Sequence, residues 1–177
     1  MIHLNNIYYF IDKFDSEEIK KLDKKVNIIY RNYKFNNNLK TIKAIKDICR
    51  KNKRKFYIAN DLDLALKLNL DGVYIPSFNK SLKIKYISKK NFEILGSAHN
   101  FKEIYFKKKQ GINKIFISPL FKIIKTNKYL GVIKYNLLSK YAYNENIALG
   151  GINKNNIKKI RMVNCKGFAG IKYFKNG

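Results

Sequence analysis

The sequence is poor in the residues and segments that build metal centres, disulfide frameworks or membrane anchors. Only Cys49 and Cys165 are cysteines, and they lack the spacing of a metal site or of an obvious disulfide pair. We therefore expect two inert core thiols. No apolar run reaches the roughly 18 residues that a membrane-spanning helix needs. The opening residues, MIHLNNIYYF, lack the basic flank and cleavage site of a signal peptide, so we expect a cytoplasmic protein.

Acidic residues are also scarce. Asp and Glu number 12 against 38 Lys and Arg, which gives a formal net charge of +26. A chain this basic is expected to bind polyanions non-specifically at low salt. A dedicated nucleic-acid site would concentrate the charge on one face, whereas the only dense basic cluster is KNKRK at 51–55. Nucleic-acid binding through the basic surface is therefore the least favoured of three functions.

Hydrophobic and aromatic residues are plentiful, at 46% and 14% of 177 residues. This length and composition predict a single domain over 1–177 with one buried core. Eight short β-branched or aromatic runs are typical of strands buried on both faces. They are IYYFI at 7, VNIIYR at 26, KFYIAN at 55, GVYIP at 72, EILGSA at 93, KIFISP at 114, NIALGG at 146 and GFAGI at 167.

Helical patterns lie between these runs. Apolar residues from Leu39 to Cys49 follow a helical spacing, and Asp15 with Glu18 and Asn100 with Glu103 have the spacing of a capping box. A further helix is expected after a cap at Asn153.

The alternation of strand and helix predicts a TIM (β/α)8 barrel, with a doubly wound open sheet as the alternative. Such barrels usually take 200 residues or more. Because the chain ends soon after GFAGI, we expect the final helix to be missing, and a partner subunit in a homo-oligomer is one candidate to cover that position.

Polar or glycine residues follow most of the strand runs, where a barrel carries its active site. They are Arg31, Asn60 with Asp61, Ser97 with His99, Ser118, Gly150 with Gly151, and the glycines from 167 to 170.

The stretch ALGGINKNNIKKI, residues 148–160, raises the question of what lies against its backbone. Paired glycines allow a ligand to approach the main chain, and the N–H groups of a helix start favour an anion. We therefore predict a phosphate site at Gly150, Gly151 and Ile152. A tight strand-to-helix turn is the alternative reason for the glycines.

These motifs, in this order, resemble the thiamine phosphate synthase and TenI family. IYRNY at 29–33 resembles the family's Gln-Leu-Arg-x-Lys, and IANDLDLALKLNLDGVYI at 58–75 resembles Asn-Asp, an Ala-rich helix and Asp-Gly-Val-His. LGSAH at 95–99 resembles Gly-x-Ser-x-His, and SPLF at 118–121 resembles Gly-Pro-Val-Phe. IALGGIN and GFAGI resemble the two glycine segments that hold a thiazole phosphate in that family.

The resemblance implies transfer of a hydroxymethylpyrimidine group from its diphosphate to a thiazole phosphate, with release of pyrophosphate. Mg²⁺ and hydrogen-bond donors would stabilise the charge on the leaving group. The residues that the resemblance implies for transfer are Arg31, Asn60, Ser97 and Lys125, with Lys128 as the alternative lysine. It implies Asp61 and Asn79 as metal ligands, and Gly150, Gly151, Ile152, Ala169 and Gly170 as phosphate ligands.

Several positions depart from the family's pattern. Asn79 stands where the family has a second magnesium carboxylate, which predicts a weakened metal site. Ile29, Tyr33 and Tyr74 replace Gln, Lys and His, and Lys172 replaces Ser. The glycine segments are therefore better kept than the magnesium and pyrimidine residues. This favours, as a second function, a TenI-like paralogue that binds a thiazole or other small phosphate as an isomerase or a non-catalytic module.

Three of these residues also suit a structural role. Asp61 fits the N-cap of the following helix as well as it fits a metal ligand. His99 lies beside the capping residue Asn100, and Arg31 could be a surface charge.

Overall fold

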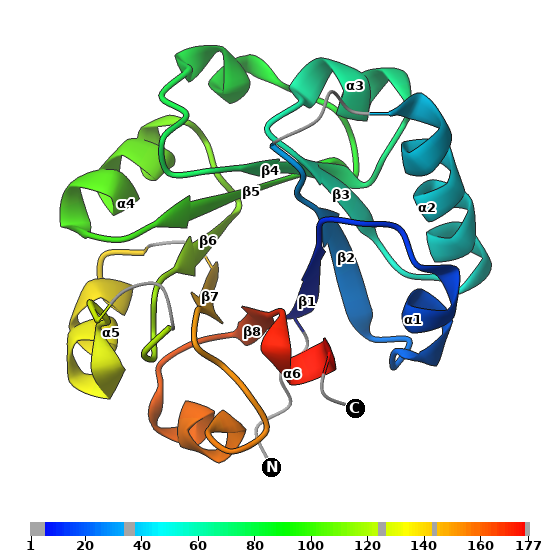
Figure 1. The fold of residues 1–177 in the computed structure, drawn as a ribbon. Coiled ribbons are helices and arrows are strands. Elements are labelled where there is room, and N and C mark those ends of the chain that lie inside the picture. Colours follow the sequence, from blue (N-terminus) through cyan, green and yellow to red (C-terminus); the bar gives the residue numbers. More distant parts are fainter. Residues whose placement is uncertain (1–5, 34–37, 124–126, 143–144, 176–177) are drawn as a thin grey trace.

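The computed structural model describes residues 6–33, 38–123, 127–142 and 145–175. Eight parallel strands form a closed barrel in which each strand pairs with the next along the chain and β8 pairs with β1 (Figure 1). The strands are β1 (Asn6–Ile11), β2 (Val26–Tyr30), β3 (Phe56–Ala59), β4 (Gly72–Ile75), β5 (Glu93–Ala98), β6 (Lys114–Ile117), β7 (Glu145–Leu149) and β8 (Gly167–Gly170). The predicted barrel and its eight strand runs are confirmed, and the open sheet is not formed.

Helices surround the barrel. They are α1 (Ser16–Lys21), α2 (Leu39–Lys51), α3 (Leu62–Lys67), α4 (Phe101–Lys109), α5 (Gly131–Ser139) and α6 (Lys172–Lys175), with 3-10 helices η1 (Leu82–Tyr86) and η2 (Ile157–Met162). Two expectations are wrong. A short helix, α6, does follow β8, and the segment directly after Asn153 forms turns and then the 3-10 helix η2 in place of the expected α-helix.

The capping predictions differ in outcome. At α4, Asn100 Oδ1 accepts from the Glu103 N–H at 3.0 Å, and Glu103 Oε2 accepts from the His99 N–H at 2.8 Å, which makes a reciprocal cap one residue out of the expected register. At α1, Asp15 caps the Glu17 and Glu18 N–H groups, but the Glu18 carboxylate instead accepts from the Tyr9 hydroxyl at 2.5 Å. The second capping box is therefore only half formed.

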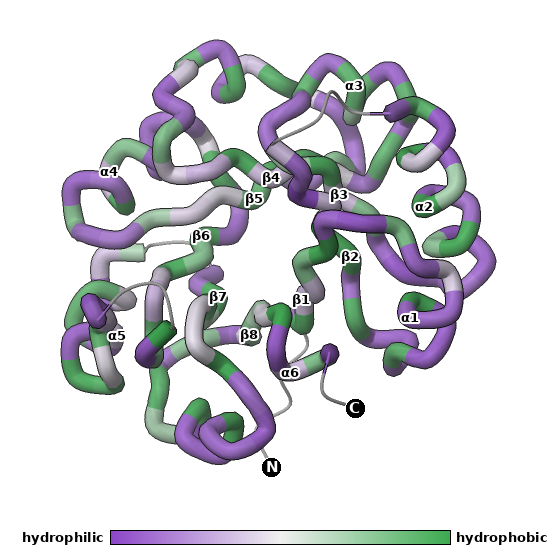
Figure 2. Tube along the Cα trace, viewed as in Figure 1, coloured by the Kyte–Doolittle hydropathy of each residue, from purple (hydrophilic) through white to green (hydrophobic). Residues whose placement is uncertain are grey.

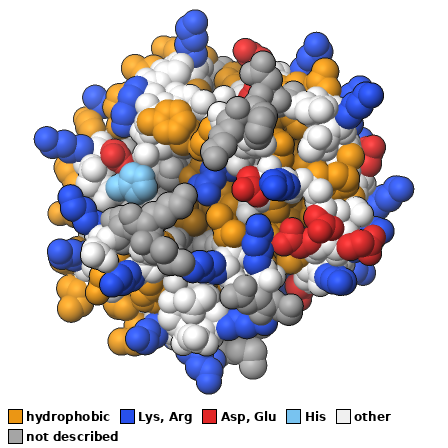
Figure 3. Space-filling model, viewed as in Figure 1, with side chains coloured by type: hydrophobic (Ala, Val, Ile, Leu, Met, Phe, Trp, Pro, Cys, Tyr) orange, Lys and Arg blue, Asp and Glu red, His pale blue; other side chains and the backbone are white. Residues whose placement is uncertain are grey.

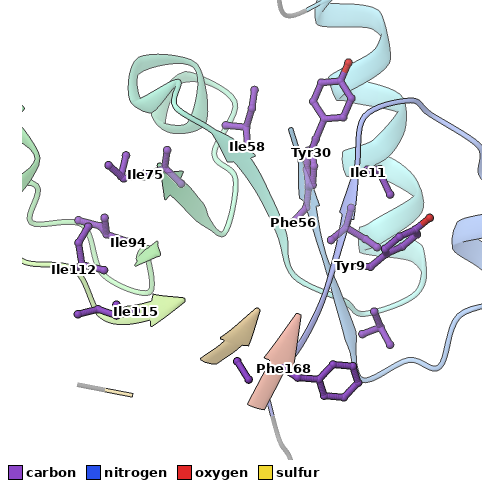
Figure 4. Packing of buried hydrophobic residues seen from close by; sticks show 14 of the residues in the cluster. Tyr9, Ile11, Tyr30, Phe56, Ile58, Ile75, Ile94, Ile112, Ile115 and Phe168 are labelled. Carbon is purple, nitrogen blue, oxygen red and sulfur yellow. The ribbon is translucent and has the colours of Figure 1, made fainter. Parts of the chain in front are cut away.

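Hydrophobic side chains fill two layers, one inside the barrel and one between the strands and the helices. Figure 2 shows hydrophobic residues along the strands and hydrophilic residues on many outer turns. Figure 4 shows part of the outer layer, including Ile11, Ile58 and Ile115. Inside the barrel, the rings of Phe10, Tyr74 and Phe116 lie edge to face with centroids 5.1 to 6.1 Å apart. The barrel is therefore packed rather than hollow.

The seam between β1 and β8 is covered by aromatic side chains of α6. The Phe174 ring lies 4.9 Å from the Tyr9 ring, and the Tyr173 ring lies 5.1 Å from the Phe168 ring. Two aromatic residues thus cover apolar surface that a longer helix would cover.

Both cysteines are free thiols; Cys49 is buried in the core as expected, whereas Cys165 is half-buried and packs against the core from its edge. Burial raises the pKa of Cys49 to about 12 and also raises the pKa of Cys165. Raised thiol pKa values disfavour the reactive thiolate. In the described part of the chain, the helices fall short of the length and apolar character required to cross a bilayer.

Candidate functional site

A cavity of about 910 Å³ opens at the carboxyl-terminal end of the barrel. It is lined from the ends of β2, β5, β6, β7 and β8, which bring residues distant in sequence to one place. Of the predicted site residues, Arg31, Lys128, Gly150, Gly151, Ile152 and Gly170 line it. His99, Ser118 and Lys172 line it too.

Positive charge surrounds this cavity. Arg31, Lys122, Lys128 and Lys172 contribute to its lining, and no Asp or Glu does so among the described residues. Figure 3 shows Lys and Arg spread widely over the visible face, with several acidic side chains gathered on one side. The cavity is therefore suited to an anionic ligand.

Arg31 follows β2 directly, and two contacts fix it. Its N–H donates to the Ile11 carbonyl at 2.8 Å, which continues the β1–β2 pairing by one residue. Its guanidinium carbon lies 4.7 Å from the centroid of the Phe10 ring, a cation–π contact. Since Phe10 belongs to the aromatic layer inside the barrel, that layer forms the floor beneath Arg31. The guanidinium is held at the barrel mouth, where its remaining donors suit a phosphate.

The loop after β6 lies against the backbone of the paired glycines. Gly150 and Gly151 have φ angles of +93° and +72°. A Cβ on Gly150 would lie 2.8 Å from Pro119, and a Cβ on Gly151 would lie 2.4 Å from the Phe121 carbonyl oxygen. The Phe121 N–H also donates to the Gly150 carbonyl at 3.0 Å. Close packing of protein on protein is therefore one reason for these glycines.

The same backbone also presents donors to the cavity lining. Among the described residues, no protein group accepts a hydrogen bond from the N–H groups of Gly150, Gly151 or Ile152. The Gly151 carbonyl is occupied, since it accepts from Asn156 Nδ2 at 2.8 Å. Adjacent unpaired N–H groups in a turn are a common anion-binding arrangement. A phosphate site and a tight turn are thus compatible at this position.

His99 and Ser118 meet at the edge of the cavity. His99 Nδ1 lies 2.9 Å from the Ser118 carbonyl oxygen and 3.1 Å from Ser118 Oγ. Because a carbonyl can only accept, the contact with the Ser118 carbonyl requires a proton on Nδ1. While Nδ1 donates to that carbonyl, His99 cannot take a proton from Ser118 Oγ through the same nitrogen. The pair therefore does not form a serine nucleophile with its base.

The predicted metal and pyrimidine residues gather at a second place, the β3–β4 edge, which we define as Asn60, Asp61 and Asn79. Asn79 Nδ2 donates to Asn60 Oδ1 at 2.7 Å, and Asn79 Oδ1 accepts from the Ser81 N–H at 2.9 Å. Asp61 Oδ1 accepts from the Leu64 N–H at 3.1 Å, so Asp61 is the N-cap of α3. None of the three lines the cavity.

The β3–β4 edge offers magnesium one carboxylate and two amide oxygens that already accept hydrogen bonds. In the described part of the chain, no group of three or more His, Cys, Asp and Glu could hold a metal ion. Magnesium commonly binds through one or two carboxylates plus substrate phosphates. The residues therefore fit an ion that arrives with a diphosphate better than an ion caged by protein.

Two predicted residues, Ser97 and Ala169, lie elsewhere. Ser97 is 5% exposed and forms a hydrogen bond with Tyr74, whose pKa burial raises. Ala169 is fully buried inside the barrel, and only its neighbour Gly170 reaches the cavity. Lys125 lies outside the described residues.

Sequence reasoning missed Lys122 in the cavity lining and two buried polar residues, Lys107 and Gln110. Nothing in the sequence distinguishes Lys122 from the many other lysines of the chain. Lys107 could have been noticed from the helical spacing, because it lies three residues after the buried Ile104 on the inner face of α4.

Comparison with known proteins agrees with this geometry. The family described as thiamine monophosphate synthase (TMP-TENI) matches residues 19–174. A thiamine-phosphate synthase of Prochlorococcus marinus subsp. pastoris is 32% identical over 170 residues, which cover 91% of this chain and 48% of the relative. One of Pelagibacter ubique is 30% identical over 174 residues, which cover 91% and 80%.

Among solved structures, thiamine phosphate pyrophosphorylase from Pyrococcus furiosus superposes with a TM-score of 0.76 at 18% identity, over 97% of this chain and 91% of the other. This likeness supports the barrel fold. The chain spans about half the length of the Prochlorococcus relative. The match over residues 19–174 nonetheless covers most of the sequence, and the chain belongs to the thiamine monophosphate synthase (TMP-TENI) family.

Proposed function

We propose that this chain joins hydroxymethylpyrimidine diphosphate to a thiazole phosphate and releases pyrophosphate, giving thiamine phosphate. The observation that carries the proposal is the cavity at the carboxyl end of the barrel. Among the described residues, four cationic side chains line it and three backbone N–H groups at Gly150, Gly151 and Ile152 have no protein acceptor. Two phosphorylated substrates require two anion sites within reach of each other. Family membership adds support, since relatives over most of this chain's length are named thiamine-phosphate synthases.

In this proposal the backbone of Gly150, Gly151 and Ile152 holds the thiazole phosphate. Arg31 grips the diphosphate with two parallel donors, and Lys128 adds a second positive charge. Both neutralise charge that builds on the leaving pyrophosphate as the carbon–oxygen bond breaks. Magnesium, proposed to be held by Asp61 and the diphosphate oxygens, would supply further neutralisation of that charge.

The β3–β4 edge must open for this chemistry. Asn79 Nδ2 donates a hydrogen bond to Asn60 Oδ1 at 2.7 Å, so a diphosphate that binds there has to replace that hydrogen bond. Asn60 can then donate through its Nδ2 to a phosphate oxygen. The cost is small, since exchanging one neutral hydrogen bond for one to an anion is favourable.

The test is formation of thiamine phosphate by the purified protein supplied with both substrates, with and without Mg²⁺. We expect magnesium-dependent product, with a large loss in Arg31→Lys, since lysine cannot reproduce the planar bidentate grip. Lys102→Met, an exposed change on the outer helix α4, is the matched control and should remain active. A wild-type protein that binds both substrates and forms no product would refute the transferase.

A second function, a TenI-like module that binds a thiazole or other small phosphate without transfer, is favoured by one observation. The amide groups of Asn60 and Asn79 are hydrogen-bonded to each other, whereas the N–H groups of Gly150 and Gly151 have no acceptor in the part of the chain that the structure describes. Thiazole phosphate that protects the fold against heat without magnesium, together with absent synthesis, would support this function.

A further inference from the structure

Two fully buried polar residues of the α4 region, Lys107 and Gln110, have no part in the site described above. Lys107 Nζ donates to the Pro76 carbonyl at 2.7 Å, to the Asn79 carbonyl at 3.0 Å and to Gln110 Oε1 at 2.8 Å. Gln110 Nε2 donates to the Asn79 carbonyl at 3.1 Å and to the Ser81 carbonyl at 2.8 Å. Apart from the lysine–glutamine contact, every acceptor lies in the segment 76–81, which we call the β4 loop.

A buried ammonium is costly unless all its donors are satisfied. Here three N–H donors meet three acceptor oxygens. The pKa of Lys107 is lowered to about 8, mainly by burial and to a smaller extent by nearby Lys80, while Glu103 opposes the shift. An apolar residue on this inner helix face would avoid the desolvation cost. The gain that offsets this cost is a fixed position of the β4 loop against α4.

The β4 loop in turn reaches the ends of two other strands. Its Asn79 donates to Asn60 Oδ1 at 2.7 Å at the end of β3. Its exposed Phe78 ring packs edge to face on Tyr33, with centroids 5.6 Å apart, beyond the end of β2. Asn60 itself has a φ of +60°, a conformation that neighbouring contacts must hold. A displacement of the loop would therefore move the polar groups at the β3–β4 edge.

We propose that Lys107 is a positioning residue for the β3–β4 edge. Together with Gln110 it fixes the backbone of the β4 loop, so that the side chains of Asn79 and Asn60 stay at the barrel mouth, where they can exchange their mutual hydrogen bond for one to a diphosphate ligand. Lys107 acts only through the loop, since it does not line the cavity. The ligand's identity rests on the proposed function, whereas the mechanical link from Lys107 to Asn60 does not.

The link is tested without any ligand, by amide resonances of the ¹⁵N-labelled protein. In Lys107→Met we expect the side-chain NH₂ signals of Asn60 and Asn79 to shift. Lys102→Met, which removes the same charge from the exposed face of α4, should leave both in place. A second variant, Gln110→Leu, removes the hydrogen bonds from Nε2 to the Asn79 and Ser81 carbonyls and should shift the same signals. Unmoved Asn60 signals in both variants would overturn the proposal, and Gln110→Leu decides it if Lys107→Met does not fold.

The functional consequence is tested by separate KM measurements for the two substrates. We expect Lys107→Met to raise the KM for the pyrimidine diphosphate about tenfold, since small misplacements of binding groups have large effects. The KM for thiazole phosphate should stay within about twofold, because the glycine site lies across the mouth. An equal loss for both substrates would indicate general destabilisation and overturn the proposal.

The two hypotheses fail in different ways. A wild-type protein without synthase activity defeats the proposed function, and the resonance test then decides the inference alone. If the protein is active but the Asn60 resonances do not shift in Lys107→Met, the positioning role of Lys107 is refuted and the proposed function stands.

Discussion

The two sides of the barrel mouth are built differently. Around β6, β7 and β8, the cavity is lined by lysines and by glycine N–H groups that have no acceptor within the described ranges of the chain. At the β3–β4 edge, Asn60, Asn79 and Asp61 are engaged with one another or with nearby backbone. The first side needs no rearrangement to receive an anion, whereas the second must exchange existing hydrogen bonds. The glycine side is thus preorganised, and affinity for its ligand should be the more robust of the two.

The largest expected effect is on the glycine side, from Gly151→Ala. The new Cβ would overlap the Phe121 carbonyl at 2.4 Å while φ is +72°. We expect about 3 kcal/mol or more of lost stability, from strain and clash together, and loss of thiazole phosphate binding. Chemical denaturation and calorimetry measure the two effects. A variant with normal stability and normal thiazole phosphate affinity would show that the loop after β6 adjusts to the added Cβ. The glycine side would then be no more rigid than the β3–β4 edge.

Asp61→Asn addresses the other side with little effect on the fold. Asparagine is as good an N-cap as aspartate, so the melting temperature should change little while the only carboxylate of the β3–β4 edge is lost. We expect kcat/KM at fixed Mg²⁺ to fall about 100-fold, the size of a lost charged contact. Unchanged magnesium dependence would mean that Asp61 is only the cap of α3.

Asn79→Asp would make the two sides more alike by adding a second carboxylate. Asn60 can turn its amide to donate to the new carboxylate, so the pair survives. We expect the magnesium concentration for half-maximal activity to fall about tenfold, since added charged oxygen ligands tighten divalent sites. A rise in that concentration would show that the present amide pair serves the reaction better.

The smallest effect concerns pH and Lys107. Its pKa is lowered from the ordinary 10.5 to about 8 in the folded protein, so between these values the unfolded chain binds more protons. The contribution of Lys107 to the free energy of unfolding therefore rises with pH over this window and is lost as pH falls below about 8. We expect urea titrations of Lys107→Met to lack this slope, which cannot exceed about 1.4 kcal/mol per pH unit. Lys102→Met should retain it.

The sequence predicts the barrel well because buried parallel strands are recognisable as short apolar runs, such as KIFIS. It fails after β7 for a local reason. Asn153 Oδ1 accepts from the N–H groups of Asn155 and Asn156, and Asn156 reaches back to Gly151. These side chains compete with the helical pattern of backbone hydrogen bonds, so the expected helix is replaced by turns and η2.

The candidate site is only partly readable for a different reason. Arg31 and the glycines could be found from their places at strand ends, and both line the cavity. The role of Lys107 depends on its hydrogen bonds to the backbone carbonyls of Pro76 and Asn79 in the β4 loop. Every residue has such a carbonyl, so the sequence does not indicate which ones accept a hydrogen bond from a distant side chain.

The aromatic cover of the β1–β8 seam has a consequence for the order of assembly. The strands that meet there stand at opposite ends of the barrel's sequence, so their pairing carries the greatest loop-closure entropy of any strand pair in the fold. Tyr173 and Phe174 act after that closure, because Tyr9 and Phe168 offer them a surface only when β1 and β8 are adjacent. We therefore expect the short α6 to pack only after the barrel has closed, and its contacts with Tyr9 and Phe168 to slow the separation of β1 from β8.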